Sequence, residues 1–203
     1  MTLNQITIRQ LQSGDAEALA AFYNGLSTAS KRTFRPLGET TTRDICADVA
    51  AGNADGDIAC DGGKHPTKYD LIALEDDRII GWGFLWELDA EDPDDGPVFG
   101  LAVADAYHGQ GLGSQLMSQV IAWADAQSLP QVILIVVQDN AIAQHIYEQQ
   151  GFVRYGECVG EDGLDYYRMR RCSRSEVKSL ESSPQINVGL RTRSQLADMT
   201  VDS

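Results

Sequence analysis

The chain has 203 residues, 43% of them apolar and 23% charged, which suits one globular domain with a full core. Its net charge of −14 argues against nucleic acid or an anionic membrane surface as the main partner and would suit a cationic amine substrate. No apolar run approaches the roughly 20 residues that span a bilayer, and we recognise no secretion signal or paired-cysteine motif, so we expect a cytoplasmic protein without disulfides or a zinc site.

The first fifty residues predict a strand and two helices. Ile6–Arg9 alternates apolar and polar residues, as a half-buried strand does. Ser13 or Asp15 is a candidate cap for the helix that follows, and a second helix is predicted from Thr40 to Ala51. The segment between the helices, Ser27–Leu37, is basic and shows no clear periodicity.

A loop and a hairpin come next. Residues 52–66 are rich in Gly and Asp, and the Asp spacing does not match a calcium loop, so we infer a surface loop and no metal. Tyr69–Leu74 and Ile79–Leu88 predict the two arms of a β-hairpin. Three aromatic residues alternate along the second arm and share one face: Trp82, Phe84 and Trp86. Core packing explains them, and a wall facing a substrate is the alternative.

A strand, a glycine-rich turn and a helix then follow in order. The strand is Val98–Val103, the turn is His108–Gly113, and the helix is predicted from Ser114 to Gln127. The first N–H groups of a helix lack internal partners, and glycines let an anion approach them, so this turn should hold a phosphate group. Two common phosphate-binding patterns fail here, because no Lys follows the last glycine and the glycines are spaced by two throughout. An ordinary tight turn is the alternative.

The remaining pattern completes a mixed sheet. Gln131–Val137 is almost wholly apolar, as a strand buried on both faces is. Asn140–Gln150 predicts a helix that ends at a glycine, and residues 152–158 and 164–170 predict a last hairpin. We therefore expect one domain over residues 1–171. The serine-rich and polar residues 172–203 predict a flexible or docking tail.

The stretch from Val98 to Phe152 resembles the GNAT superfamily of N-acetyltransferases. Those proteins carry Gln/Arg-x-x-Gly-x-Gly/Ala at the turn that holds the pyrophosphate of acetyl-CoA, followed by a strand, an Asn, a Tyr and a Gly-Phe pair. The matching residues stand in the same order at the family's spacing: His108, Gly111, Gly113, Asn140, Tyr147, Gly151 and Phe152. The departure is His108, which occupies the position of Gln or Arg.

The resemblance implies an α/β fold, with a mixed central sheet that contains a splayed pair of strands and is flanked by helices. It implies an enzyme that moves an acetyl group from acetyl-CoA to a primary amine, either a small amine or an amine of a peptide or protein, without a metal. The alternative is a CoA-binding sensor or assembly module that has lost catalysis. Relatives often form homodimers, and the sequence decides neither the oligomeric state nor the identity of the acceptor.

The resemblance also implies which residues contact the coenzyme. The backbone of the central strand would pair with the pantetheine arm, the Val103 N–H would stabilise the oxyanion, and the turn would hold the pyrophosphate. The residues concerned are Leu101, Ala102, Val103, His108, Gly109, Gln110, Gly111, Leu112, Gly113, Ser114 and Asn140.

Roles in the chemistry follow from the same resemblance. Tyr147 matches the tyrosine beside the coenzyme sulfur and is expected to act as general acid, with simple aromatic packing as the alternative. Relatives often place a base glutamate on the central strand, which has no carboxylate here, so Glu87 and Asp89 are the nearest candidates. Phe34, Arg35 and Trp82 are the candidates for contact with the acceptor.

Overall fold

The computed structural model describes residues 6–51, 68–87, 96–160 and 162–173. Our expectations for Asp89, for the loop at 52–66 and for a tail after residue 173 lie outside these residues. The described strands are β1 (Ile6–Gln10), β2 (Lys68–Glu75), β3 (Arg78–Trp86), β4 (Val98–Val103), β5 (Gln131–Val137), β6 (Val153–Val159) and β7 (Asp165–Cys172). The described α-helices are α1 (Ala16–Gly25), α2 (Thr28–Thr33), α3 (Arg43–Ala51), α4 (Leu112–Ala126) and α5 (Ala141–Gln149).

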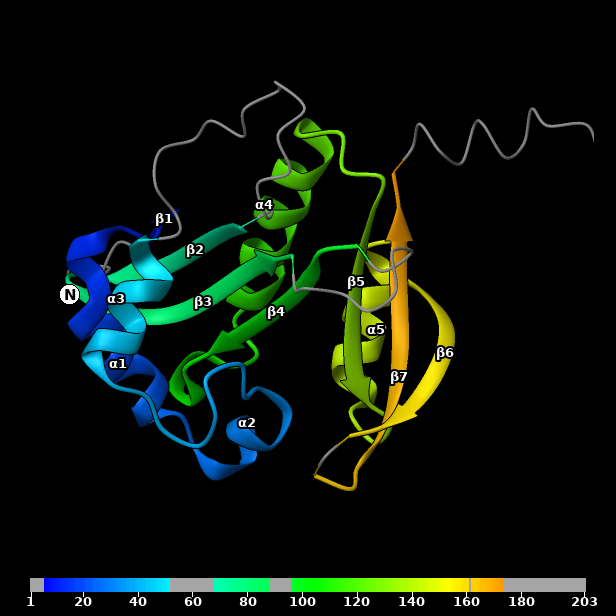
Figure 1. Ribbon diagram of the computed structural model, residues 1–203, viewed down its shortest axis with the longest axis horizontal. Helices are drawn as coiled ribbons and strands as arrows, with labels where there is room; N and C mark the ends of the chain where they lie inside the picture. Colours follow the sequence, from blue (N-terminus) through cyan, green and yellow to red (C-terminus); the bar gives the residue numbers. More distant parts are fainter. Residues whose placement is uncertain (1–5, 52–67, 88–95, 161, 174–203) are drawn as a thin grey trace, which may run out of the picture. The chain divides into compact units, whose positions relative to one another are not determined.

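The strands form one mixed sheet in the order β1-β2-β3-β4-β5-β7-β6. Strands β1 to β4 run antiparallel to one another, and so do β5, β7 and β6. The two halves meet at β4 and β5, which run parallel and pair only at Val98 and Ile133. Beyond that pair the two strands separate (Figure 1). The predicted α/β architecture with a splayed pair of strands is therefore confirmed.

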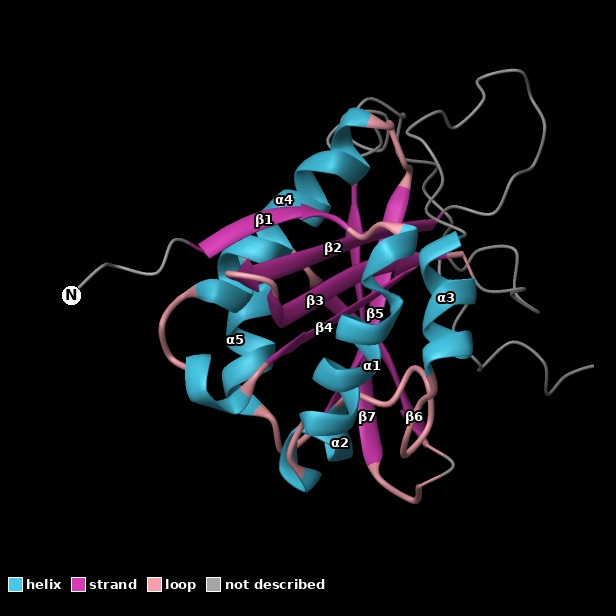
Figure 2. Cartoon of the chain, turned by 90° about the vertical axis from the view of Figure 1, so that its left-hand side faces the viewer, coloured by secondary structure: helices cyan, strands magenta, loops and turns pink. Residues whose placement is uncertain are grey.

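Helices cover both faces of this sheet. In Figure 2, α1, α2 and α3 lie on one side, and α4 and α5 lie on the other. The strand period of two places Trp82 and Phe84 of β3 in the core under α1 and α3 and Leu85 in the core under α4. Ile80 also joins the core under α4, out of phase with Trp82, because the register between β2 and β3 shifts beside it. No α-helix among the described ranges is long and apolar enough to cross a membrane.

A glycine on β3 sets the distance between the sheet and α4. A Cβ atom at Gly81 would lie 2.7 Å from Cδ1 of Leu116 on α4, which is closer than two carbon atoms pack. The register between β2 and β3 also shifts beside this glycine, between Ala73 and Leu74. Both features bring α4 close to the strand that pairs with β4.

Three local predictions require correction. The basic segment contains a short helix, α2, capped by the Ser27 hydroxyl, which accepts a hydrogen bond from the Ser30 N–H at 3.2 Å. Neither predicted side chain caps α1, because the Asp15 carboxylate instead accepts from Arg9 and from the Gln12 N–H. The second helix begins at Arg43 rather than Thr40, and Thr42 supplies the hydroxyl that accepts from its first turn.

Candidate active site

The separation of β4 from β5 exposes one backbone edge of β4. The Ala104 N–H donates to the Ile80 carbonyl at 2.8 Å, so this residue faces β3. Because backbone groups of successive strand residues point to opposite sides, Leu101 and Val103 present theirs toward the gap. An extended ligand could therefore bond to β4 as a further strand would.

The turn after β4 opens α4 at Leu112, two residues earlier than predicted. Gly111 is the N-cap residue with φ of +81°, and Gly109 has φ of +73°, backbone conformations that suit glycine. No side chain caps the helix, and a Cβ atom at either glycine would meet no heavy atom within 4 Å. The N–H groups at the start of α4 thus face open space at the positive end of the helix dipole, where an anion binds well.

Two residues of the turn, His108 and Gly113, have contacts that differ from those predicted. The His108 Nε2 lies 2.8 Å from the Val103 carbonyl oxygen, so the imidazole folds back onto β4 instead of facing the phosphate position. This contact occupies the carbonyl of Val103 and leaves its N–H for a ligand. The third glycine, Gly113, lies beside β4, where a Cβ atom would be 3.5 Å from Cδ2 of Leu101, an ordinary contact, so the packing does not require a glycine at this position.

Helix α5 supplies the two side chains that were expected near the coenzyme. The Asn140 Oδ1 accepts from the Ala143 N–H at 3.2 Å, so this residue caps the helix. Tyr147 is partly buried and packs between Phe99 and Phe152, with ring centroids 6.3 and 6.1 Å away. Burial raises the pKa of Tyr147 to about 12, so the phenol keeps its proton at neutral pH and can donate it.

A pocket of about 740 Å³ opens beside Tyr147, between the two halves of the sheet. Leu101 and Ile135 line it from β4 and β5, and Phe84 and Trp86 line it from β3. Ile135 is 55% exposed although β5 is almost wholly apolar, because the separation of the strands leaves this part of β5 uncovered. The prediction that β5 is buried on both faces is therefore wrong at this residue.

The three predicted acceptor residues have different positions. Phe34 and Arg35 line the pocket, and the Arg35 guanidinium bonds Asp162 at 2.8 Å and Glu39 at 3.0 Å. Trp82 has no exposed surface, because it packs in the core under α1, and its place on the pocket wall is taken by Phe84 and Trp86.

Glu87, one of the two predicted candidates for the base, is exposed and does not line the pocket, whereas Glu39 and Asp162 do. Hydrogen bonds from the Tyr166 hydroxyl and the Leu164 N–H, together with Arg35, lower the pKa of Asp162. Sequence reasoning missed Asp162, although it lies in an acidic turn of the last hairpin. No set of His, Cys, Asp and Glu side chains in the part of the chain described here could hold a metal ion.

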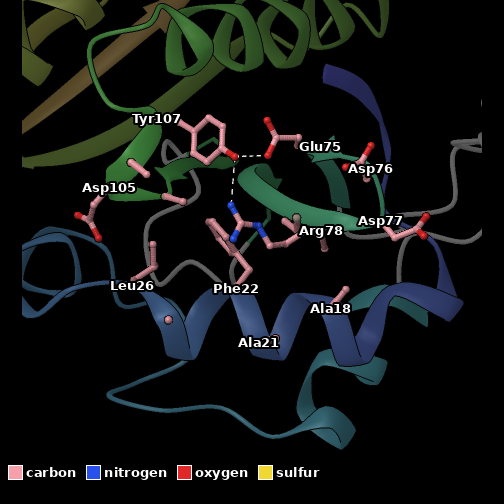
Figure 3. A pocket seen from close by; sticks show the side chains of 14 residues that line it. Ala18, Ala21, Phe22, Leu26, Glu75, Asp76, Asp77, Arg78, Asp105 and Tyr107 are labelled. Atoms are coloured by element: carbon pink, nitrogen blue, oxygen red, sulfur yellow. Dashed lines mark hydrogen bonds between the residues drawn. The ribbon is translucent and has the colours of Figure 1, made fainter. Parts of the chain in front are cut away.

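A second and larger pocket, of about 910 Å³, lies between α1 and the β2–β3 turn (Figure 3). The Tyr107 hydroxyl donates to the Glu75 carboxylate and accepts from Arg78 at 3.1 Å. Asp105 lines the same pocket and accepts from the hydroxyls of Ser27 and Ser30, which ties α2 to the turn after β4. Neither Leu101 nor Tyr147 lines this pocket, so we place the chemistry in the smaller one.

A model of the acetyltransferase (GNAT) family matches residues 41–152, which is more than half of the chain. The chain belongs to the GNAT acetyltransferase family. Its fold agrees with that of a GNAT-family acetyltransferase from Streptococcus pneumoniae, with a TM-score of 0.68 and 25% identity over 83% of this chain and 99% of that one. The family and the fold predicted from the resemblance are thus confirmed.

Two further similar proteins carry the names of their acceptors. The [ribosomal protein bS18]-alanine N-acetyltransferase of Haemophilus ducreyi is 34% identical over 42% of this chain and 57% of its own length. The spermidine N-acetyltransferase of Vibrio cholerae, whose structure holds CoA and spermine, shares the fold with a TM-score of 0.63 and 19% identity, over 83% of this chain and 96% of that one. The alignments span 27% to 57% of the length of the curated relatives.

Proposed function

We propose that this GNAT chain transfers an acetyl group from acetyl-CoA to a primary amine. The observation that carries the proposal is that Tyr147 and the open edge of β4 at Leu101 line one pocket. The same helix-and-glycine turn that suits a pyrophosphate follows directly after that strand. The names of the similar proteins, a ribosomal-protein alanine acetyltransferase and a spermidine acetyltransferase, support an amine as the acceptor.

Binding of acetyl-CoA would use the backbone of the chain. The N–H groups of Leu112, Gly113 and Ser114 face the pyrophosphate, with the backbone of Gly109 and Gly111 shaping the turn. The free edge at Leu101 pairs with the pantetheine arm, so the thioester comes to lie at the Val103 N–H and beside Tyr147. Side chains of His108, Gln110 and Asn140 instead support the local backbone, through the Val103, Ala106 and Ala143 groups that they contact.

The reaction joins the amine nitrogen to the acetyl carbon and breaks the bond from that carbon to sulfur. The Val103 N–H stabilises the oxyanion that forms, a contribution on the order of 3 kcal/mol for one such donor. The sulfur leaves with the proton of the Tyr147 hydroxyl, and the proton that the attacking nitrogen then loses restores the phenol. The products are an N-acetylated amine and free CoA.

The acceptor nitrogen must lose a proton before it attacks. Asp162 has a lowered pKa, so it is a weak base and is better suited to hold the ammonium form of the acceptor in the pocket. Glu87 and Asp89 stay our predictions for the base, acting directly or through water. Phe34, Arg35, Phe84 and Trp86 would surround the rest of the acceptor.

The test is release of free thiol from acetyl-CoA with a panel of amines: spermidine, free amino acids, a lysine peptide and an alanine-initiated peptide. Tyr147→Phe should lower kcat roughly 100-fold and leave the KM for acetyl-CoA within a factor of two, because the phenol acts only on the leaving sulfur. Tyr69→Phe is the matched control, since Tyr69 stacks on Trp123 and lines neither pocket.

Two outcomes would contradict this function. Unchanged turnover in Tyr147→Phe would remove Tyr147 from the mechanism. Absence of thiol release across the panel, from protein that binds acetyl-CoA in calorimetry, would favour the CoA-binding sensor.

A further inference from the structure

A buried carboxylate lies beneath the aromatic wall of the acceptor pocket, and acetyl transfer does not use it. Asp70 on β2 lies in the core beside α1 and α3 and has no exposed surface. A buried charge is unfavourable unless it is hydrogen-bonded. Asp70 therefore has partners that compensate its burial, and these partners indicate what it does.

Two of the partners are indole N–H groups from β3. The Trp82 Nε1 donates to Asp70 Oδ1 at 2.8 Å, and the Trp86 Nε1 donates to both carboxylate oxygens, at 3.1 and 3.2 Å. The strand register makes this geometry, because Asp70 pairs directly with Phe84, which stands between the two tryptophans. One carboxylate thus fixes a tryptophan of the core and a tryptophan of the pocket.

Trp86 is also held by its other neighbours. Its ring stacks on Phe84 with centroids 4.1 Å apart, and the Lys68 Nζ lies 5.7 Å from its centroid. The Lys68 ammonium is itself fixed, since it donates to the Val49 carbonyl at 2.7 Å. Phe84 and Trp86 both line the pocket beside Tyr147, so the orientation of Trp86 decides the shape of that wall.

We propose that Asp70 is a positioning residue for the acceptor, which holds Trp86 in the orientation that forms the aromatic wall of the pocket. The proposal rests on the proposed function, because it assigns the wall to the amine acceptor. The proposal predicts different effects on the two substrates. Asp70 and Trp86 lie on β2 and β3, whereas the coenzyme residues lie on β4 and in the turn before α4. Loss of the carboxylate should therefore weaken acceptor binding and leave acetyl-CoA binding unchanged.

Two variants that keep the number of side-chain heavy atoms test this role. Asp70→Leu removes both acceptors for the indole N–H groups, whereas Asp70→Asn keeps an oxygen that can accept from them. With the panel amine that gives the fastest thiol release, Asp70→Leu should raise the acceptor KM about tenfold and the KM for acetyl-CoA less than twofold. Asp70→Asn should restore most of the acceptor affinity. Asp77→Leu, at an exposed carboxylate of the β2–β3 turn, is the control for the loss of charge.

Nuclear magnetic resonance gives a readout that needs no activity. The chain has three tryptophans, so the indole N–H region of a ¹H–¹⁵N spectrum should hold three signals, and Trp86→Phe assigns one of them. In Asp70→Leu the Trp86 and Trp82 signals should move away from their hydrogen-bonded positions, while the Trp123 signal stays.

The outcomes of the two measurements separate the two proposals. Acetyl transfer by the wild-type chain with an unchanged acceptor KM in folded Asp70→Leu would overturn the role of Asp70 and leave the proposed function standing. Equal rises in both KM values would also overturn it, because they would show a general structural loss. If the wild-type chain transfers no acetyl group, the proposed function fails, and an unmoved Trp86 signal in Asp70→Leu overturns the positioning role independently.

Discussion

The two ends of the proposed active site are built in different ways. The proposed coenzyme end uses backbone groups from one continuous stretch, residues 98–114, where a strand edge, two glycines with positive φ and a helix N-terminus follow one another. The acceptor end uses side chains from α2, β3, α5 and the β6–β7 turn, which lie far apart in the sequence. A site made of backbone groups can be recognised from a local sequence pattern, whereas a site made of side chains depends on how distant segments pack.

The largest expected effect falls on the coenzyme end. Gly111→Asp should raise the Kd for acetyl-CoA at least 100-fold, because it places a negative charge beside the N–H groups that hold the pyrophosphate. Gly111→Asn is the matched control, since Asn is neutral and tolerates a φ of +81° about as well as Asp. Calorimetry with acetyl-CoA measures both. Retained affinity in Gly111→Asp would refute the assignment of this turn to the phosphates.

A smaller expected effect concerns the acceptor end and is seen in how the free energy of unfolding depends on pH. Burial raises the pKa of Asp70 to about 6, only partly offset by the two indole N–H groups and Lys68, against about 3.9 in an unfolded chain. Between these values the folded chain binds more protons than the unfolded chain, so the free energy of unfolding falls as pH rises from about 4 to 6. The total fall from this group is on the order of 3 kcal/mol.

About half of that fall lies between pH 5 and pH 8, a range above the sequence pI of about 4.4. Urea unfolding at pH 5 and pH 8 should show a loss of about 1.4 kcal/mol in the wild type that Asp70→Asn lacks, because an amide does not titrate. Equal pH dependence in the two proteins would contradict the raised pKa of Asp70.

The smallest effect concerns the ion pair at the pocket mouth. Arg35 and Asp162 join the α2–α3 segment to the β6–β7 turn at 2.8 Å, and both are partly open to solvent. Asp162→Asn should raise the KM of a cationic acceptor about threefold at low salt, with a smaller rise at 0.5 M salt, where charges are screened. The KM for acetyl-CoA should not change. Asp44→Asn, which removes an exposed negative charge outside the pocket lining, controls for the change in net charge.

If Asp162→Asn raised both KM values equally, the separation of the site into two ends would be wrong. If the rise in the acceptor KM were independent of salt, the carboxylate would act through the Tyr166 hydroxyl and the Leu164 N–H that it contacts rather than through charge.

The apolar strands at the centre of the sheet were predicted well, and a short helix and the start of a capped helix were not. The bounds of β4 and β5 agree with the prediction because each is a run of apolar residues closed by polar residues or turns. Helix α2 was missed because its six residues, five of them polar, carry no apolar period, and its position depends on Asp105 from a distant turn. The start of α4 was missed by two residues because the glycine itself, with positive φ, is the N-cap.

The sequence by itself determined the family, the α/β order of elements and the turn before α4, because these depend on local spacing and backbone chemistry. Only the tertiary structure decided which side chains meet at the acceptor pocket. It folded His108 onto Val103, buried Trp82, and brought Asp162 to the pocket in place of Glu87. The reason is physical: side-chain contacts between distant segments follow from strand register and helix packing, which no short stretch of sequence encodes.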